Sequence, residues 1–200
     1  MKSYRQKGNV LVVTLILLLV FTVLGTASIG DVTLNQRISA NYRDRNISFQ
    51  AAEAALKEAE DVVVDLAAVH AWGNFDANCT GSDCFTPTCN GGLCFNGSYP
   101  TANDCASNPP SNPLWMDSDT WDEVGVAAES ILDPNNLSEK PKYIIEFMCF
   151  IPSDPDNNPT PTSNYPGPEW SVMYRITAYS KGEGSGSISM VQSTYKVNPN

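Results

Sequence analysis

The 200-residue sequence predicts an α+β fold, in which one long N-terminal helix packs on an antiparallel sheet of about three to four strands with a disulfide-rich loop. Three patterns predict this fold. An uncharged apolar run near the N-terminus continues without proline into a stretch with helical spacing. The middle of the chain is rich in Asn, Gly, Pro and Cys, as long loops are. The C-terminal part alternates apolar and polar residues around a glycine-rich turn, as a hairpin does.

The apolar run, residues 9–30, is long enough to cross a membrane. Residues 8–30 carry no charge, and a helix of that length spans about 35 Å. Three basic residues precede the run and Asp31 follows it, so the positive-inside rule leaves the N-terminus in the cytoplasm and sends the rest of the chain across the membrane. The alternatives are a plain single-pass anchor and a secretory signal peptide. Thr26-Ala27-Ser28 could imitate the cleavage site of a signal peptide.

Helical spacing continues through residues 31–70, which form the amphipathic half of the predicted helix. Acid–base pairs such as Glu53 and Lys57 lie four residues apart on its outer face. Its apolar positions fall three, four or seven residues apart: Leu34, Ile38, Tyr42, Phe49, Ala52, Leu56, Ala59, Val63, Leu66 and Val69. Signal-peptide cleavage near Ala27 would remove half of this helix, which argues against that alternative. We expect the sheet to cover the apolar stripe of the second half.

Residues 71–141 form the predicted Cys-rich loop. An even number of cysteines beyond a membrane span indicates disulfides in an oxidising compartment, and the four-residue gaps match no common zinc site. Six cysteines permit fifteen pairings; local closure suggests Cys79–Cys84 and Cys89–Cys94, which leaves Cys105–Cys149. A short helix is expected between Asp119 and Ala128, with Asp119 or Thr120 as its cap.

Residues 142–200 carry the predicted sheet. From Lys142 onward, two mostly apolar sets of residues alternate, which predicts a strand buried on both faces. The first set is Tyr143, Ile145, Phe147, Cys149 and Ile151. Two further strands follow, beginning at Trp170 and Ile188, and the glycine-rich turn between them predicts a hairpin.

Charge and motifs exclude several classes of protein. Twelve Lys and Arg against 22 Asp and Glu give a net charge of −10, the wrong sign for a nucleic-acid binder. The chain has one histidine and no nucleophile elbow, P-loop or dinucleotide fingerprint, so we expect neither an enzyme nor a cofactor. Asp154, Asp156 and Asn158 are spaced like the start of a calcium loop, but Pro159 stands where the EF-hand needs glycine. A polar turn is the default there, and a looser calcium site is the weak alternative.

The N-terminus resembles that of a type IV prepilin. A short basic leader, residues 1–8, ends in Gly8 and is followed directly by the apolar helix. The resemblance implies the type IV pilin fold, cleavage after Gly8 by a prepilin peptidase, and methylation of the new N-terminal amine of Asn9.

A narrower resemblance is to minor pilins of the PilX type. It rests on residues 41–56, NYRDRNISFQAAEAAL, and on the final hairpin, YRITA at 174–178 with VQSTY at 191–195. Most pilins carry Glu at the fifth position after the cut, where this chain has Val13. That Glu is thought to neutralise the amine of a neighbouring subunit, so its lack fits a subunit at the tip of the filament.

The resemblance implies a structural subunit that primes assembly of a type IV pilus. Its expected partners are other minor pilins, the major pilin, the prepilin peptidase and a PilY-type tip adhesin. Its expected location is the inner membrane, with the head in the periplasm, and then the pilus at the cell surface. A minor pseudopilin of a type II secretion system and a surface adhesin that binds through its Cys-rich loop are the alternatives.

Overall fold

The computed structural model describes residues 9–69, 72–75, 79–95, 113–129, 137–157 and 169–198. The chain divides into two compact units, residues 1–43 and residues 44–200. We call these the stem unit and the head unit. The leader and Cys105 lie outside the described residues.

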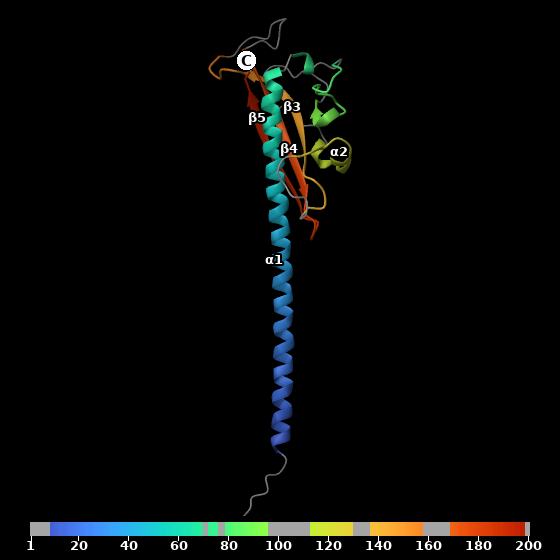
Figure 1. Ribbon diagram of the computed structural model, residues 1–200. Helices are drawn as coiled ribbons and strands as arrows, with labels where there is room; N and C mark the ends of the chain where they lie inside the picture. Colours follow the sequence, from blue (N-terminus) through green and yellow to red (C-terminus); the bar gives the residue numbers. More distant parts are fainter. Residues whose placement is uncertain are drawn as a thin grey trace, which may run out of the picture. The chain divides into compact units, whose positions relative to one another are not determined.

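Helix α1, Asn9–Val69, is the single long helix that the spacing predicts. It contributes to both units, because the division between them falls at Arg43 and Asp44. The head-unit part of α1, residues 44–69, lies alongside strands β3, β4 and β5 (Figure 1).

The sheet has five strands and is mixed. Its long strands are β3 (Lys142–Pro152), β4 (Trp170–Lys181) and β5 (Ile188–Val197), which pair antiparallel in that order. Two short strands pair with the other edge of β3. β1 (Leu93–Cys94) is parallel to β3, and β2 (Val126–Ala127) is antiparallel to it. The predicted α+β class and antiparallel hairpin are confirmed; the two short strands, one of them parallel, bring the sheet to five strands instead of the expected three to four. Two-residue strands are too short to show a period in the sequence.

The alternation predicted for β3 breaks at Met148. The register shifts between Phe147 and Cys149, which marks a bulge. The extra residue turns Phe150 onto the same face as Phe147 and moves Cys149 to the opposite face, so the predicted grouping is wrong beyond Phe147. When both faces of a strand are apolar, a bulge does not change the pattern of apolar residues in the sequence, so the pattern could not predict it.

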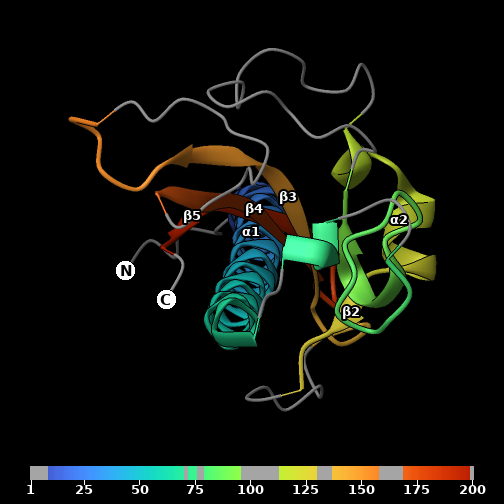
Figure 2. The same ribbon diagram turned by 90° about the horizontal axis from the view of Figure 1, so that it is seen from above.

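A short helix, α2, occupies Ser118–Glu123, after a 3₁₀ turn, η3, at Leu114–Met116. Its cap is Asp117, whose carboxylate accepts a hydrogen bond from the Asp119 N–H at 3.1 Å; the predicted caps, Asp119 and Thr120, lie inside the helix instead. Residues 126–127 belong to β2 and not to the helix. Figure 2 shows α2 and β2 on the β3 side of the sheet, away from β5.

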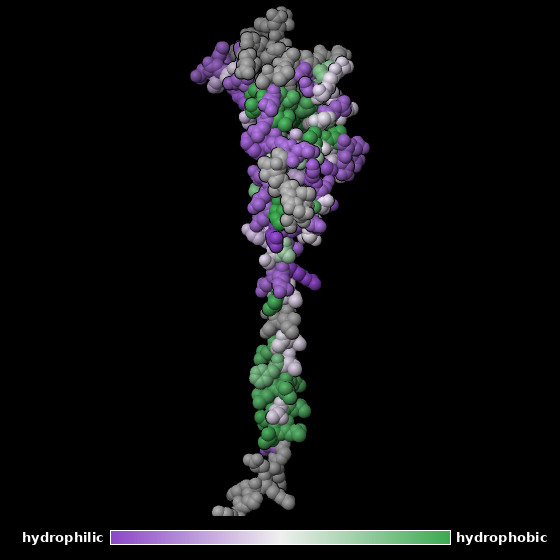
Figure 3. Space-filling model, viewed as in Figure 1, coloured by the Kyte–Doolittle hydropathy of each residue, from purple (hydrophilic) through white to green (hydrophobic). Residues whose placement is uncertain are grey.

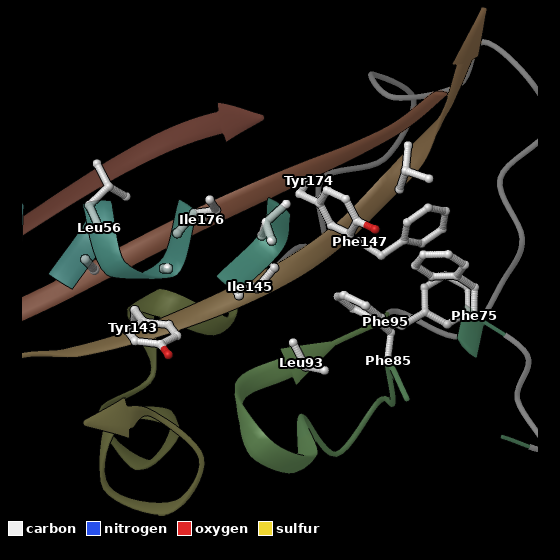
Figure 4. Close-up of a cluster of buried hydrophobic side chains, with 14 of the residues drawn as sticks. Leu56, Phe75, Phe85, Leu93, Phe95, Tyr143, Ile145, Phe147, Tyr174 and Ile176 are labelled. Carbon is white, nitrogen blue, oxygen red and sulfur yellow. The ribbon is translucent and has the colours of Figure 1, made fainter. Parts of the chain in front are cut away.

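The main core lies between one face of the sheet and the head-unit part of α1. The helix contributes Ala55, Leu56, Ala59 and Val63, and the sheet contributes residues such as Ile145, Tyr174 and Ile176. Aromatic rings gather at one end of this core, where Phe75 and Phe147 have ring centroids 4.6 Å apart (Figure 4). Small alanine side chains let the helix backbone approach the sheet closely. Phe49, which the spacing placed in the stripe, is 49% exposed instead, because the buried face of the helix runs through Asp44, Ser48 and Ala52.

A second apolar cluster covers the opposite face of the sheet. Its buried members are Cys89, Cys94, Trp121 and Ile144. Trp121 stacks on Tyr179 with ring centroids 5.0 Å apart, and its indole N–H donates to the Trp115 carbonyl at 3.1 Å. β3 is therefore covered on both faces, as its two apolar sets predict.

Candidate functional site

The stem unit presents an apolar helix surface that the other described residues of the chain leave uncovered. The large apolar side chains between Val10 and Leu24 are 45–71% exposed, and Figure 3 shows them as a hydrophobic band. Among the described residues, Asn9–Thr26 is the segment whose length and composition suit a membrane span. Exposing so much apolar surface to water is unfavourable, so the segment suits an apolar environment such as lipid.

The polar side chains of this segment are satisfied within the helix. The hydroxyls of Thr14, Thr22 and Thr26 donate to carbonyl oxygens three residues earlier, at 2.9, 2.8 and 3.0 Å. A hydroxyl bonded in this way can enter an apolar environment at little cost. The segment is thus compatible with lipid along its whole length.

The predicted processing and filament-core positions lie at the start of α1. Asn9 is the first described residue of the helix, and Gly8 lies outside the described residues. Val13 is 54% exposed within the apolar surface. The first carboxylate of the chain after the leader is Asp31, so the segment itself offers no group that could neutralise an amine.

A carboxylate site that the sequence analysis missed fastens the head-unit part of α1 to the β4–β5 turn. Asp44 is only 7% exposed and accepts hydrogen bonds from the N–H groups of Gly184 at 3.1 Å and Ser185 at 2.9 Å, and from the Ser185 hydroxyl. A more distant N–H, that of Ser187, lies at 3.4 Å. One turn along the helix, the hydroxyls of Ser48 and Ser189 are 2.7 Å apart. We call this set of contacts the Asp44 clip.

The clip depends on glycine and lowers the pKa of its carboxyl group. A Cβ atom at Gly182 would lie 2.5 Å from Asp44 Oδ1, so only glycine lets the turn come this close. The hydrogen bonds, chiefly that from the Ser185 hydroxyl and then those from the backbone, lower the pKa of Asp44 from 3.8 to about 2. The glycine- and serine-rich turn was the available clue in the sequence, but its partner is about 140 residues away and could not be read from local spacing.

Disulfides hold the Cys-rich segment. The structure joins Cys79 to Cys84 and Cys89 to Cys94, and Cys149 is also disulfide-bonded. Both Cys89 and Cys94 are buried in the second apolar cluster, and their bond closes the turn that leads into β1, which pairs with β3. The prediction that this segment is stapled by disulfides is confirmed; Cys105, the expected partner of Cys149, lies outside the described residues.

The weak calcium candidate is a polar turn after β3. The Asp154 carboxylate accepts a hydrogen bond from the Asp156 N–H at 3.0 Å, and the Asp154 carbonyl accepts one from the Asn157 N–H at 3.2 Å. Asn158 lies outside the described residues. In the part of the chain that the structure describes, no three His, Cys, Asp or Glu side chains gather as metal ligands would.

These features define the class of protein. A long helix with an apolar N-terminal segment, and a sheet packed on the head-unit part of that helix, is the arrangement that the resemblance to type IV pilins predicts. Two family models then match the chain: PilX N-terminal over residues 7–57, and type IV pilus assembly protein PilX C-term over residues 90–197. The chain belongs to the PilX family of type IV pilus assembly proteins, whose members are structural pilus subunits and not enzymes. Neither a curated protein nor a solved structure is found to match the chain.

Membership of this family, together with the apolar helix, indicates a minor pilin that is anchored in a membrane and associates with other pilus components. The Asp44 clip leads to a prediction about the stability of the head.

Replacing Asp44 by Asn should destabilise the head by about 1–3 kcal/mol at neutral pH, because hydrogen bonds to a charged acceptor are lost. The folded pKa lies below the unfolded one, so the clip stabilises fully above pH 3.8 and its contribution disappears as the pH falls toward 2. Urea unfolding of the detergent-solubilised full chain, followed by tryptophan fluorescence at pH 7, 4 and 2.5, measures this difference. Asp65→Asn, an exposed position on the same helix, is the control. An equal loss for both variants at pH 7 would contradict the clip.

Proposed function

We propose that this chain is a minor pilin of the tip complex that primes assembly of a type IV pilus. The observation that carries the proposal is the uncovered apolar half of α1, which continues without interruption into the helix segment that bears the head. Such a surface suits two environments in turn: lipid while the subunit is stored, and neighbouring apolar helices once it enters a filament.

The storage site is the inner membrane, with the head in the periplasm. Lys2, Arg5 and Lys7 keep the leader on the cytoplasmic side, where a prepilin peptidase reaches Gly8. The disulfides of the Cys-rich segment support export of the head to an oxidising compartment. After assembly the head lies at the cell surface as part of the pilus.

The tip position is supported by the absence of a carboxylate in the apolar segment. A carboxylate buried in an apolar filament core is costly unless a positive charge pairs with it. A subunit with no neighbour above it has no such partner, so an apolar residue at position 13 is the less costly choice. Other minor pilins, the major pilin and a PilY-type adhesin are the partners that this position implies.

Deletion of the gene should abolish or strongly reduce surface piliation and twitching motility, because priming precedes elongation. Counting pili by electron microscopy and measuring twitching zones tests this expectation, and re-expression of the wild-type chain should restore both. Loss of enzyme export with normal piliation would favour a type II secretion pseudopilin. Normal piliation with loss of adhesion would favour a surface adhesin that binds through its Cys-rich segment.

Cleavage after Gly8 should leave Asn9 as an N-methylated first residue. Mass spectrometry of the membrane-purified protein should therefore find a chain without Lys2, Arg5 and Lys7, with a net charge of −13 instead of −10. Gly8→Val should retain the leader, because a branched side chain replaces the glycine before the cut. Gly25→Ala, where a Cβ atom would meet nothing within 4 Å, should be processed normally. A mature chain that begins near Ser28 would restore the signal-peptide interpretation.

Val13→Glu should reduce assembly only mildly. With no subunit above, the new carboxyl group stays unpaired, and it limits the cost by binding a proton in its apolar surroundings. Immunogold labelling of the wild-type and variant proteins should mark pilus ends, and sheared pili should contain about one copy each. Labelling along the shaft, at an abundance near that of the major pilin, would contradict the tip position while leaving membership of the family untouched.

A further inference from the structure

A buried glutamate lies on the sheet face opposite α1. Glu146, on β3, is 9% exposed, and its Oε2 atom finds no hydrogen-bond partner among the described residues. Desolvation, offset in part by Arg175, raises the pKa of Glu146 to about 7. A buried carboxyl group that is half ionised near neutral pH is unusual for a group that serves only solubility.

Arg175 is placed to respond to Glu146 but is engaged elsewhere. The two residues are directly opposite in the β3–β4 register, so their side chains share one face of the sheet. No ion pair joins the two side chains within the described residues. The Arg175 guanidinium group lies over the Trp115 ring instead, with its carbon 4.7 Å from the ring centroid. A cation over an aromatic face is attracted to it, and Arg175 therefore ties Trp115 to the sheet.

Trp115 belongs to the segment that covers this face, residues 113–124, which we call the cover segment. It contains η3 and α2. The bond from the Trp121 indole to the Trp115 carbonyl links the two, and Trp121 is buried against Ile144 and Tyr179. The position of Trp115 and the packing of the cover segment are thus coupled.

The ionisable groups beside Glu146 on the neighbouring strands are paired, neutral or disulfide-bonded, and Asp117, Asp119 and Glu123 of the cover segment are exposed. On β3, Lys142 lies four residues away on the same face and forms ion pairs with Glu139 at 2.8 Å and with Asp122 of α2 at 3.7 Å. On β4, Tyr179 titrates above its ordinary pKa because it is partly desolvated. On β1, Cys94 is opposite Glu146 and is held in a disulfide. Among these groups Arg175 is the cation directly opposite the carboxyl group.

We propose that Glu146 and Arg175 form a pH-sensitive latch on the cover segment: neutral Glu146 leaves Arg175 on Trp115, and ionised Glu146 draws Arg175 away and loosens the segment. A buried carboxylate requires a counter-ion or water. Arg175 supplies the first by leaving the Trp115 ring, and opening of the cover segment supplies the second. Both responses weaken the contact between cover segment and sheet.

The sign of the effect follows from the pKa. The folded chain keeps the Glu146 proton up to about pH 7, whereas the unfolded chain loses it near pH 4.5. The cover is therefore most stable below about pH 4.5, and its stability falls as the pH rises through 7. Opening would expose the second apolar cluster, so the apolar surface of the head would depend on the pH around it.

Hydrogen exchange tests the latch on the full-length, disulfide-bonded protein in detergent between pH 5.5 and 8.5. After correction for intrinsic rates, protection of amides 114–125 should fall at least tenfold across this range, with a midpoint near pH 7, since each pKa unit corresponds to a tenfold change. Glu146→Gln should keep the low-pH protection throughout, because its amide cannot ionise. Asp122→Asn, which removes an exposed acid of the cover segment itself, should retain the transition.

A second variant keeps the test decisive if Glu146→Gln does not fold. Trp115→Leu removes the ring and leaves Glu146 in place, so protection of the cover segment should be low at every pH with no transition. Constant protection in the wild type, or an unchanged transition in Glu146→Gln or in Trp115→Leu, would overturn the latch. None of these results depends on where the subunit lies in a pilus.

Discussion

The structure depends on one physical constraint: the first half of α1 cannot remain in water. Its large apolar side chains from Val10 to Leu24 are exposed, and the hydroxyls of Thr14, Thr22 and Thr26 are bonded to its own backbone. Nothing in the helix offers a charge to water until Asp31. This segment therefore needs an apolar environment, and the membrane storage and filament packing that we propose would each supply one.

The second half of the same helix solves a different problem, because it must hold a folded head. It does so with apolar side chains, several of them small, and with carboxylates that accept hydrogen bonds from the head, of which Asp44 is the most buried. Ala55 and Ala59 allow close packing on the sheet, while the Asp44 clip fastens the β4–β5 turn. Burial of apolar area is not directional, whereas the clip specifies which turn meets which residue of the helix. The apolar packing and the Asp44 clip together fix one position of the β4–β5 hairpin on the helix.

Most of the fold could be predicted from periodicity, and the exceptions share a cause. The long helix, the strands from Lys142, Trp170 and Ile188, and the presence of disulfides all follow from patterns that repeat over many residues. The parallel strand β1, the bulge at Met148 and the Asp117 cap each involve one or two residues, which carry no period. The Asp44 clip and the position of Glu146 opposite Arg175 bring together residues that are distant in sequence. In a chain with many acidic residues, nothing in the sequence distinguishes Asp44 or Glu146 from the other carboxylates. Phe49 was misplaced because the helix buries small and polar side chains in preference to a large one.

The two faces of the sheet are held by different means because their coverings differ in composition. A regular helix covers one face, and it supplies aliphatic side chains at every turn. The other face is covered by short turns that contain few aliphatic residues, so area burial alone stabilises them little. Disulfides and a few aromatic contacts compensate: Cys89–Cys94 closes the turn that leads into β1, and Trp121 anchors α2. A covering held by so few contacts is sensitive to each of them, and this is why one ionisable pair beneath it, Glu146 and Arg175, is able to control whether it stays closed.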